Sequence, residues 1–231
     1  MKHIVVLTGA GMSAESGIKT FRDHNGLWND YRVEEVATPE AWARNMDLVI
    51  DFYNQRRKQL LAVEPNPAHY ALARLEERFK VSVVTQNIDD LHERAGSTNV
   101  LHLHGELKKV RSSRNPDKVY ELEGWELKKG DTCPEGSQLR PHVVWFGEPV
   151  PNIVPAAEIC SMADMLLIIG TSMNVYPAAG LFAYTPGEIP KYYIDPGARD
   201  TDPIPGLHLI ADKAGKAVPA LVEKLLTGGS A

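Results

Sequence analysis

Short apolar runs rich in β-branched residues recur along the chain and predict its strands. The runs occupy residues 3–7, 81–85, 100–103, 142–145, 165–169, 192–194 and 207–210. Runs of this length that do not alternate with polar residues are typical of strands buried on both faces of a parallel sheet.

Helical patterns lie between these runs. Residues 67–79 place Leu72 and Leu75 at helical spacing, and further helices are predicted over residues 154–162 and 217–226. Because strands alternate with helices, we expect an α/β fold with a doubly wound, Rossmann-like parallel sheet.

Two stretches interrupt this alternation. Residues 30–64 read as helical with no strand inside, and residues 108–140 are polar, turn-rich and weakly periodic, with Trp125 and Leu127 as candidate core residues. We expect both stretches to form a small inserted module beside the sheet. The predicted module comprises residues 31–64 and 108–140, and the predicted Rossmann-like domain comprises residues 1–30, 65–107 and 141–231.

Composition narrows the class of protein. The 231 residues are 43% hydrophobic and 24% charged, as expected for a globular protein with one large core. A formal net charge of -5 disfavours nucleic-acid binding through a strong positive field. No apolar run approaches the roughly 20 residues that span a bilayer, and the first run reads as a strand rather than a signal peptide. With only Cys133 and Cys160, we expect no disulfide framework and a cytoplasmic, reducing location.

A glycine-rich turn follows the first predicted strand. The sequence from Gly9 to Ala14 fits the pattern G-x-G-x-x-[G/A], in which the glycines let a pyrophosphate approach the backbone at the start of a helix. A tight turn without a ligand is the alternative. An ordinary dehydrogenase would next need a second strand and an acid, whereas residues 17–28 read as an irregular loop. In that loop, Arg22 could neutralise phosphate charge or could be a surface arginine.

Polar residues also follow four later strands, at positions where a parallel sheet binds ligands. They stand in residues 85–92, 102–106, 143–148 and 170–175. The alternatives are structural: Asn87 and Asp89 would cap a helix that starts near Asp90, and a lone histidine such as His104 is more often structural than catalytic.

Taken together, these segments resemble the sirtuins, a family of NAD-dependent protein-lysine deacylases. The matching motifs are Gly9-Ala10-Gly11-Met12-Ser13 with Gly17-Ile18, Phe21-Arg22, Thr85-Gln86-Asn87-Ile88-Asp89, His104-Gly105, Phe146-Gly147-Glu148 and Gly170-Thr171-Ser172. They occur in the family's order and extend from the first strand to about Val175, whereas the C-terminal part matches more loosely.

The resemblance implies a role for each matching residue. NAD phosphates and ribose would be held by Gly9, Ala10, Gly11 and Arg22; the nicotinamide ribose by Gln86 and Asn87; the nicotinamide carboxamide by Ile88 and Asp89; and the adenosine half by Gly170, Thr171, Ser172, Asp195 and Ala214. The family commonly has Asn where Asp195 stands. His104 and Asn87 would be catalytic. The peptide would add as a strand between Phe146-Gly147-Glu148 and Asn174-Val175, a mode that is largely blind to sequence.

The resemblance also implies a reaction with acyl-lysine proteins as substrates. The acyl oxygen would attack the anomeric carbon of NAD and expel nicotinamide, and His104 would then take a proton from a ribose hydroxyl. A histidine suits that step because its ordinary pKa is near 6.5. The products would be nicotinamide, free lysine and O-acyl-ADP-ribose.

The chain departs from the family in the small module. Most sirtuins carry a zinc ribbon with two Cys-x-x-Cys pairs, but here Arg111-Ser112-Ser113-Arg114 replaces one pair and Cys133 stands alone at the other. A structural zinc needs four nitrogen or sulfur ligands. We therefore expect no zinc and no other metal, and a module held by packing.

The predicted helix over residues 47–60 carries a candidate for acyl recognition. Ala37, Tyr53 and Arg56 resemble the sirtuin branch that removes succinyl and malonyl groups, in which Ala leaves room for the chain while Tyr and Arg bind its carboxylate. A guanidinium and a hydroxyl suit that partner. The alternative is that Arg56 and Arg57 belong to a solvated basic helix face.

Other functions stay open on the same sequence. An ADP-ribosyltransferase or an NAD glycohydrolase would use the same fold without Tyr53 and Arg56. A non-catalytic NAD-binding sensor would not need His104, Asn87 and Asp89 together. A hydride-transferring dehydrogenase is disfavoured because the second strand and its acid are missing.

Overall fold

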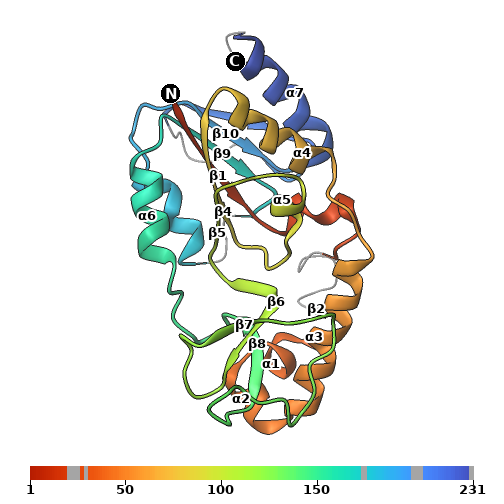
Figure 1. Cartoon of the computed structure of the whole chain (residues 1–231). Helices are drawn as coiled ribbons and strands as arrows, with labels where there is room; N and C mark the ends of the chain where they lie inside the picture. The colour runs from red at the N-terminus through yellow and green to blue at the C-terminus, as the bar shows by residue number, and fades with distance from the viewer. Residues whose placement is uncertain (20–26, 29–30, 173–175, 199–204, 229–231) are drawn as a thin grey trace.

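The computed structural model describes residues 1–19, 27–28, 31–172, 176–198 and 205–228, and within them the chain forms two principal sheets (Figure 1). The larger sheet has the order β11-β10-β9-β1-β4-β5, and all its neighbouring strands are parallel. Its strands are β1 (His3–Thr8), β4 (Lys80–Thr85), β5 (Val100–His102), β9 (Met165–Ile169), β10 (Lys191–Ile194) and β11 (Leu207–Ile210). The smaller sheet is antiparallel, with the order β7-β6-β8.

The remaining elements surround these sheets. The strands are β2 (Leu27–Trp28), β3 (Tyr31–Arg32), β6 (Gly105–Ser112), β7 (Val119–Glu121) and β8 (Leu139–Val143). The α-helices are α1 (Val33–Val36), α2 (Pro39–Arg44), α3 (Met46–Leu61), α4 (Pro67–Arg74), α5 (Leu91–Arg94), α6 (Ile153–Ser161) and α7 (Ala214–Thr227). The short 3-10 helices are η1 (Ala10–Met12), η2 (Ala14–Ser16), η3 (Leu75–Glu77) and η4 (Ala178–Tyr184).

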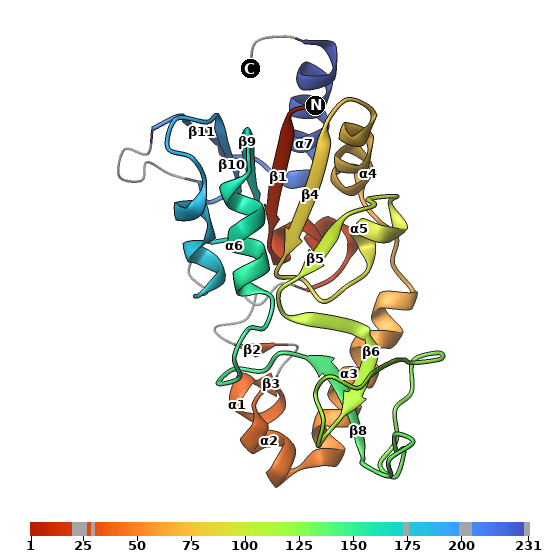
Figure 2. The same cartoon turned by 60° about the vertical axis from the view of Figure 1, so that its left-hand side comes forward.

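Helices cover both faces of the larger sheet. Figure 2 shows α4 and α7 on one side of it and α6 on the other. Successive side chains of a strand point to opposite faces, so Ile4 and Val6 of β1 pack toward α4 and α7, while Val5 and Leu7 pack toward α6. Both faces of the strand are buried, which confirms the predicted doubly wound α/β fold.

One predicted strand belongs to a different sheet. Residues 142–145 were expected in the parallel sheet, but β8 ends at Val143 and pairs antiparallel with β6. Val143 and Trp145 are buried in a separate apolar cluster with Tyr53 of α3. The prediction was wrong because a short apolar run shows that a strand is buried, but not which sheet buries it.

The two interrupting stretches also contain more strand than expected. Residues 30–64 include the two-residue strand β3 before α1, α2 and α3, and residues 108–140 contain most of the antiparallel sheet. A strand of two residues is too short to show periodicity, and polar side chains on the exposed positions of β6 and β7 obscure the alternation. The division of the chain into two modules stays a prediction.

Buried polar contacts join α3 to β6 and to the segment that follows β7. Arg57 donates from Nε to the carbonyl of Leu107 at 2.7 Å and from Nη1 to Asn54 Oδ1 at 2.9 Å. Asn54 in turn bonds both the N–H and the C=O of Leu127. Leu127 is confirmed as a core residue, whereas Trp125 is only partly buried and stacks under the ammonium of Lys58. The alternative of a solvated basic face is wrong for Arg57, because its side chain is almost fully buried.

The region of the expected zinc ribbon is also held by hydrogen bonds. Cys133 is buried, and its sulfur contacts the hydroxyls of Ser112 and Ser137. Neither hydroxyl is a usual zinc ligand, so these residues do not fit a structural zinc site. Among the residues that the structure describes, no three His, Cys, Asp or Glu side chains come together in a way that would hold a metal ion.

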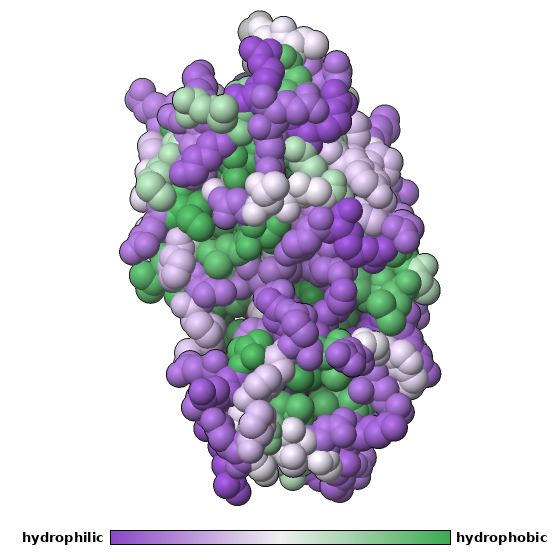
Figure 3. All heavy atoms as spheres, viewed as in Figure 1, coloured by the Kyte–Doolittle hydropathy of each residue, from purple (hydrophilic) through white to green (hydrophobic). Residues whose placement is uncertain are grey.

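Hydrophilic residues cover most of the face drawn in Figure 3, and the apolar residues on it form separate patches. The helices in the described part of the chain are all too short or too polar to cross a bilayer.

A buried histidine makes the stability of this fold depend on pH. His69 of α4 is fully buried, accepts the N–H of Asn66 at Nδ1 and packs edge-on against the ring of His92. Burial lowers its pKa from 6.5 to about 4. The unfolded chain therefore binds a proton below pH 6.5 that the folded chain refuses until about pH 4, so stability is retained above pH 6.5 and lost over that window.

We expect His69 alone to remove about 2 kcal/mol of unfolding free energy between pH 6.5 and pH 4.5. Urea unfolding at both pH values measures the loss, and His69→Gln serves as the comparison. The variant should lose about 2 kcal/mol less than the wild type over this interval. An equal loss in both proteins would contradict the assignment.

Candidate active site

The predicted site residues meet at the carboxyl ends of β1, β4 and β9. These strands end level with one another, because Thr8 pairs with Thr85 on one side and with Ile169 on the other. The loops that follow the three strands therefore emerge together at one edge of the sheet, and this edge faces the smaller sheet and α3 (Figure 2).

The glycine-rich turn packs directly on the loop after β9. Gly9 donates its N–H to the carbonyl of Ile169 at 3.0 Å, and Gly11 donates to the carbonyl of Gly170 at 2.8 Å. A Cβ at Gly11 would lie 2.7 Å from the Cα of Gly170, and one at Gly170 would lie 2.3 Å from the nitrogen of Met12. The glycines are thus required for the contact between the two loops, whatever ligand they hold.

The helix expected after this turn does not form. The chain makes two short 3-10 helices, η1 and η2, and then reaches Gly17 in the left-handed conformation at φ 95°. Ala10 stands exposed between the two glycines, where its backbone can be approached from outside. Arg22 lies outside the described residues.

The loop after β4 is fixed along four consecutive carbonyl groups. All four bonds come from residues 102–107: Leu103 N to Thr85 O at 2.9 Å, His104 Nδ1 to Gln86 O at 3.0 Å, His102 Nδ1 to Asn87 O at 2.9 Å and Leu107 N to Ile88 O at 2.7 Å. The loop and the segment that carries His104 therefore form one rigid unit.

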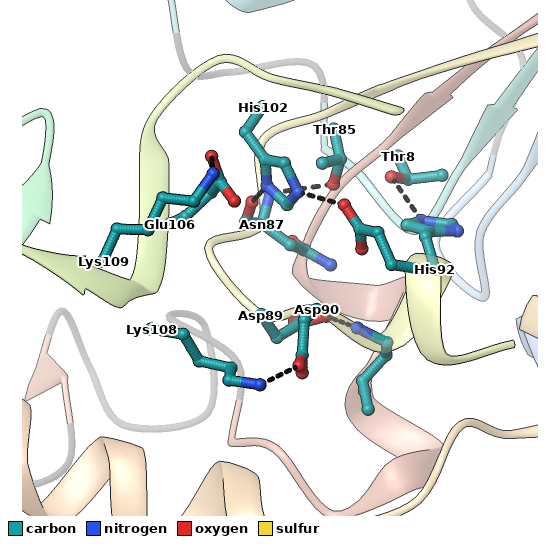
Figure 4. A network of polar contacts seen from close by, with 12 residues as sticks. Thr8, Thr85, Asn87, Asp89, Asp90, His92, His102, Glu106, Lys108 and Lys109 are labelled. Atoms are coloured by element: carbon teal, nitrogen blue, oxygen red, sulfur yellow. Dashed lines mark hydrogen bonds and ion pairs between the residues drawn. The ribbon is translucent and has the colours of Figure 1, made fainter. Parts of the chain in front are cut away.

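Asn87 and Asp89 of this loop form a buried polar group with Ser13 of the glycine-rich turn. Figure 4 shows the two loop residues. Asn87 Nδ2 donates to Ser13 Oγ at 3.0 Å, and the Ser13 hydroxyl bonds the carboxylate of Asp89. Within the described part of the chain, Oδ1 of Asn87 has no hydrogen-bond partner, so it can accept a ligand hydroxyl. Sequence reasoning gave Ser13 no role, although its place directly after the glycines was the available signal.

Neither residue is the N-cap of α5, which is Asp90, but Asp89 does bond the start of that helix. Asp89 accepts the N–H of Leu91 in the first turn of α5, whereas the side chain of Asn87 turns away from that helix to Ser13. Burial raises the pKa of Asp89, although its hydrogen bonds from Ser13 and Leu91 act in the opposite direction. All three members of the group are buried, so they are largely shielded from water.

His104 has the geometry of a base. Its Nδ1 faces the Gln86 carbonyl, which can only accept, so Nδ1 carries the proton and Nε2 keeps a lone pair in the neutral ring. Burial lowers the pKa of His104, which favours this neutral form. Its own carbonyl accepts from the N–H of Val144 at 2.9 Å, which connects it to the segment after β8.

The residues expected on the adenosine side lie at the same edge. Gln86 Nε2 donates to Thr171 Oγ1 at 3.2 Å. Asp195 follows β10 and accepts from the N–H of Gly197, Ala214 begins α7, and Ser172 is half-buried. The N–H of Gly215 bonds Glu15 at 2.7 Å, which brings the start of α7 beside the glycine-rich turn.

The expected acyl-binding residues are buried under this edge. Tyr53 and Arg56 lie one turn apart on α3, and the indole of Trp145 donates to the Tyr53 hydroxyl at 3.0 Å. Burial lowers the pKa of Arg56 to about 10, although Tyr53 and Asp89 attract its charge. Arg56 is buried, so the alternative of a solvated basic face is wrong for this residue as well. Ala37 belongs to the same apolar cluster as Tyr53 and Trp145.

The turn after β8 exposes one apolar side chain. Phe146 is 50% exposed and donates its N–H to the Ala37 carbonyl at 3.0 Å, and Gly147 adopts a φ of 90°. Glu148 accepts from Arg111, from Arg140 and from the N–H of Trp145, so its carboxylate holds the turn in place. The other residues predicted to contact the peptide, Asn174 and Val175, lie outside the described residues.

Comparison with known proteins agrees with this arrangement. The family model described as "Sir2 family" matches residues 9–177. A protein from Bacteroides thetaiotaomicron named NAD-dependent protein deacylase is 55% identical, over 98% of this chain and 99% of its own. One of the same name from Helicobacter pylori strain 26695 is 51% identical, over 98% of each chain.

Solved structures of similar fold are also Sir2 proteins. A Sir2 homologue in complex with NAD has a TM-score of 0.86 and 42% identity, covering 99% of this chain and 91% of that one. A Sir2 mutant with a deacetylated peptide and 3'-O-acetyl ADP-ribose has a TM-score of 0.77 and 31% identity, covering 98% and 93%. On the motifs, the fold and these relatives, this chain belongs to the Sir2 family.

Proposed function

We propose that this protein is an NAD-dependent protein-lysine deacylase. The observation that carries the proposal is His104, held as a neutral base beside the buried group of Asn87, Ser13 and Asp89. The names of the relatives above support the same activity.

The residues at the sheet edge fit NAD. The exposed backbone at Ala10, the open Oδ1 of Asn87 and the buried Asp89 offer groups for a phosphate, a ribose hydroxyl and a carboxamide. In the proposed arrangement, Gly9, Ala10, Gly11 and Arg22 hold the phosphates and adjoining ribose, Gln86 and Asn87 the nicotinamide ribose, Ile88 and Asp89 the carboxamide, and Gly170, Thr171, Ser172, Asp195 and Ala214 the adenosine. When bound there, NAD would supply an anomeric carbon that exchanges nicotinamide for the oxygen of the acyl-lysine.

His104 would act on the ribose. Its Nε2 accepts a proton from a ribose hydroxyl, and the Gln86 carbonyl stabilises the imidazolium that results because it already accepts from Nδ1. Asn87 orients that ribose through its amide, which Ser13 fixes from behind. The products would be nicotinamide, free lysine and O-acyl-ADP-ribose.

We expect His104→Ala to lower deacylation by about 10²–10⁴-fold, the usual effect of losing a general base. NAD affinity, measured by calorimetry, should change little because the backbone bonds of the loop remain. Near-normal turnover by a folded variant would remove His104 from the mechanism.

The buried arginine supports a preference for acidic acyl groups. A guanidinium in a water-poor pocket gains most from an anionic partner, and a succinyl or malonyl carboxylate is such a partner. Arg56 and Tyr53 are buried side by side on α3, and Ala37 contributes only a methyl group to the same cluster. We therefore propose desuccinylase and demalonylase activity in addition to deacetylation.

Incubation with NAD and matched acetyl-, succinyl- and malonyl-lysine peptides, followed by mass spectrometry, tests both the deacylase activity and the preference for acidic acyl groups. Arg56→Met should raise the Michaelis constant for succinyl peptide roughly tenfold to a hundredfold, because a bond to a charged group contributes about 1.5–3 kcal/mol. The acetyl peptide should be nearly unaffected. An equal loss for both peptides would contradict the acyl assignment.

The control for this experiment is Lys58→Met. Lys58 is a cation of the same helix, but it is exposed and stacks on Trp125, so its removal should leave the succinyl-to-acetyl ratio unchanged. Arg57 is unsuitable because its side chain is buried and bonded to Leu107 and Asn54.

The same assay distinguishes the other activities. NAD cleavage without a peptide would indicate a glycohydrolase, and ADP-ribose attached to protein would indicate a transferase. NAD binding without any turnover would indicate a sensor. We also propose a reducing, cytoplasmic location, which the two unpaired and buried cysteines support.

A further inference from the structure

A second histidine next to His104 has no role in the reaction described above. His102 ends β5 and is 7% exposed, and its ring lies between two oxygen atoms (Figure 4). Nδ1 is 2.9 Å from the carbonyl of Asn87, and Nε2 is 2.8 Å from Oε1 of Glu93. Glu93 belongs to α5, the short helix that follows the Asn87 loop.

The two partners determine where the protons of His102 are. A carbonyl oxygen has no proton to donate, and neither has an ionised carboxylate, so both ring nitrogens must donate. His102 is therefore an imidazolium paired with Glu93. Although burial acts against it, the bond and charge of Glu93 raise the pKa of His102, and the pKa of Glu93 is lowered. His104, two residues on, has one acceptor and is neutral.

The His102–Glu93 pair adds to the hydrogen bonds that hold the loop from Asn87 to Asp89. The carbonyl of Asn87 is held by His102, its N–H bonds the hydroxyl of Thr85, and its amide bonds Ser13. Asp89 accepts the N–H of Leu91 at the start of the helix that carries Glu93. Hydrogen bonds therefore hold both ends of the loop from Asn87 to Asp89. Among these bonds, the one from the charged ring of His102 is of the strongest kind.

We propose that Glu93 and His102 are positioning residues that hold the loop from Asn87 to Asp89 in the conformation that receives the nicotinamide end of NAD. The inference rests on the proposed function, which places nicotinamide at Ile88 and Asp89. His102 acts through the Asn87 carbonyl, and Glu93 acts by orienting and charging the ring of His102. Neither residue touches the reacting atoms.

Comparison of NAD with ADP-ribose tests the proposal without relying on turnover. The two ligands differ only in the nicotinamide, so a local effect on the loop alters their affinity ratio, whereas a general loss of structure weakens both. In calorimetry, His102→Ala should weaken NAD about tenfold or more, the usual scale for a lost bond to a charged group. ADP-ribose keeps the ribose that Asn87 contacts but lacks the nicotinamide, so its affinity should fall by a clearly smaller factor.

Two further variants separate orientation from charge. Glu93→Ala, at a partly exposed position, should shift the ratio in the same direction by about threefold to tenfold. Glu93→Gln should lie between wild type and Glu93→Ala, because a glutamine amide can still orient the ring by donating to Nε2 but leaves His102 neutral. The matched control is Glu106→Gln, a carboxylate that attracts His102 without bonding it; its ratio should not change.

The outcomes are distinct from those of the proposed function. If His102→Ala and Glu93→Ala, with wild-type melting temperatures, weaken both ligands equally or neither, the positioning role is overturned. If His102→Ala fails to fold, Glu93→Ala decides alone: the inference is overturned when this variant leaves the ratio of NAD to ADP-ribose affinity unchanged. A wild-type protein that binds NAD no better than ADP-ribose and deacylates no peptide would instead overturn the proposed function.

Discussion

Four successive carbonyl groups, from Thr85 to Ile88, all accept hydrogen bonds from one segment of six residues. In a regular strand, alternate carbonyls point to opposite sides, and a loop at the end of a sheet would leave some of them to water. Here side-chain nitrogens of His102 and His104 replace the missing backbone donors. Because an unsatisfied buried carbonyl costs about 1–3 kcal/mol, these bonds fix the loop before any ligand arrives.

Close backbone packing likewise fixes the two neighbouring loops, which follow β1 and β9. Gly9, Gly11 and Gly170 let two chain segments touch where any side chain would collide. The contact keeps the ends of β1 and β9 level, so that the polar loops of three strands face one volume. A ligand that spans all three loops therefore meets a surface whose shape is set by the packing of the sheet and not by the ligand.

The sequence allowed much of this arrangement to be anticipated. Alternating strands and helices predicted the doubly wound sheet, and the polar residues at the strand ends predicted which edge would carry the site. The burial of Arg57 was not predictable, because its partners Asn54 and Leu107 are brought to it only by the fold. Likewise, the sheet of β8 depends on the helix that covers Val143 and Trp145, which no local pattern encodes. The bond between Ser13 and Asn87 joins residues 74 positions apart.

The ion pairs of Glu148 have a mechanical consequence. Its carboxylate ties the turn that displays Phe146 to Arg111 of β6 and Arg140 of β8, and the adjacent N–H of Val144 is bonded to the carbonyl of His104. The turn and the histidine are thereby linked to the same small sheet. Any change in the tilt of that sheet would therefore displace the Phe146 turn and the backbone of His104 together.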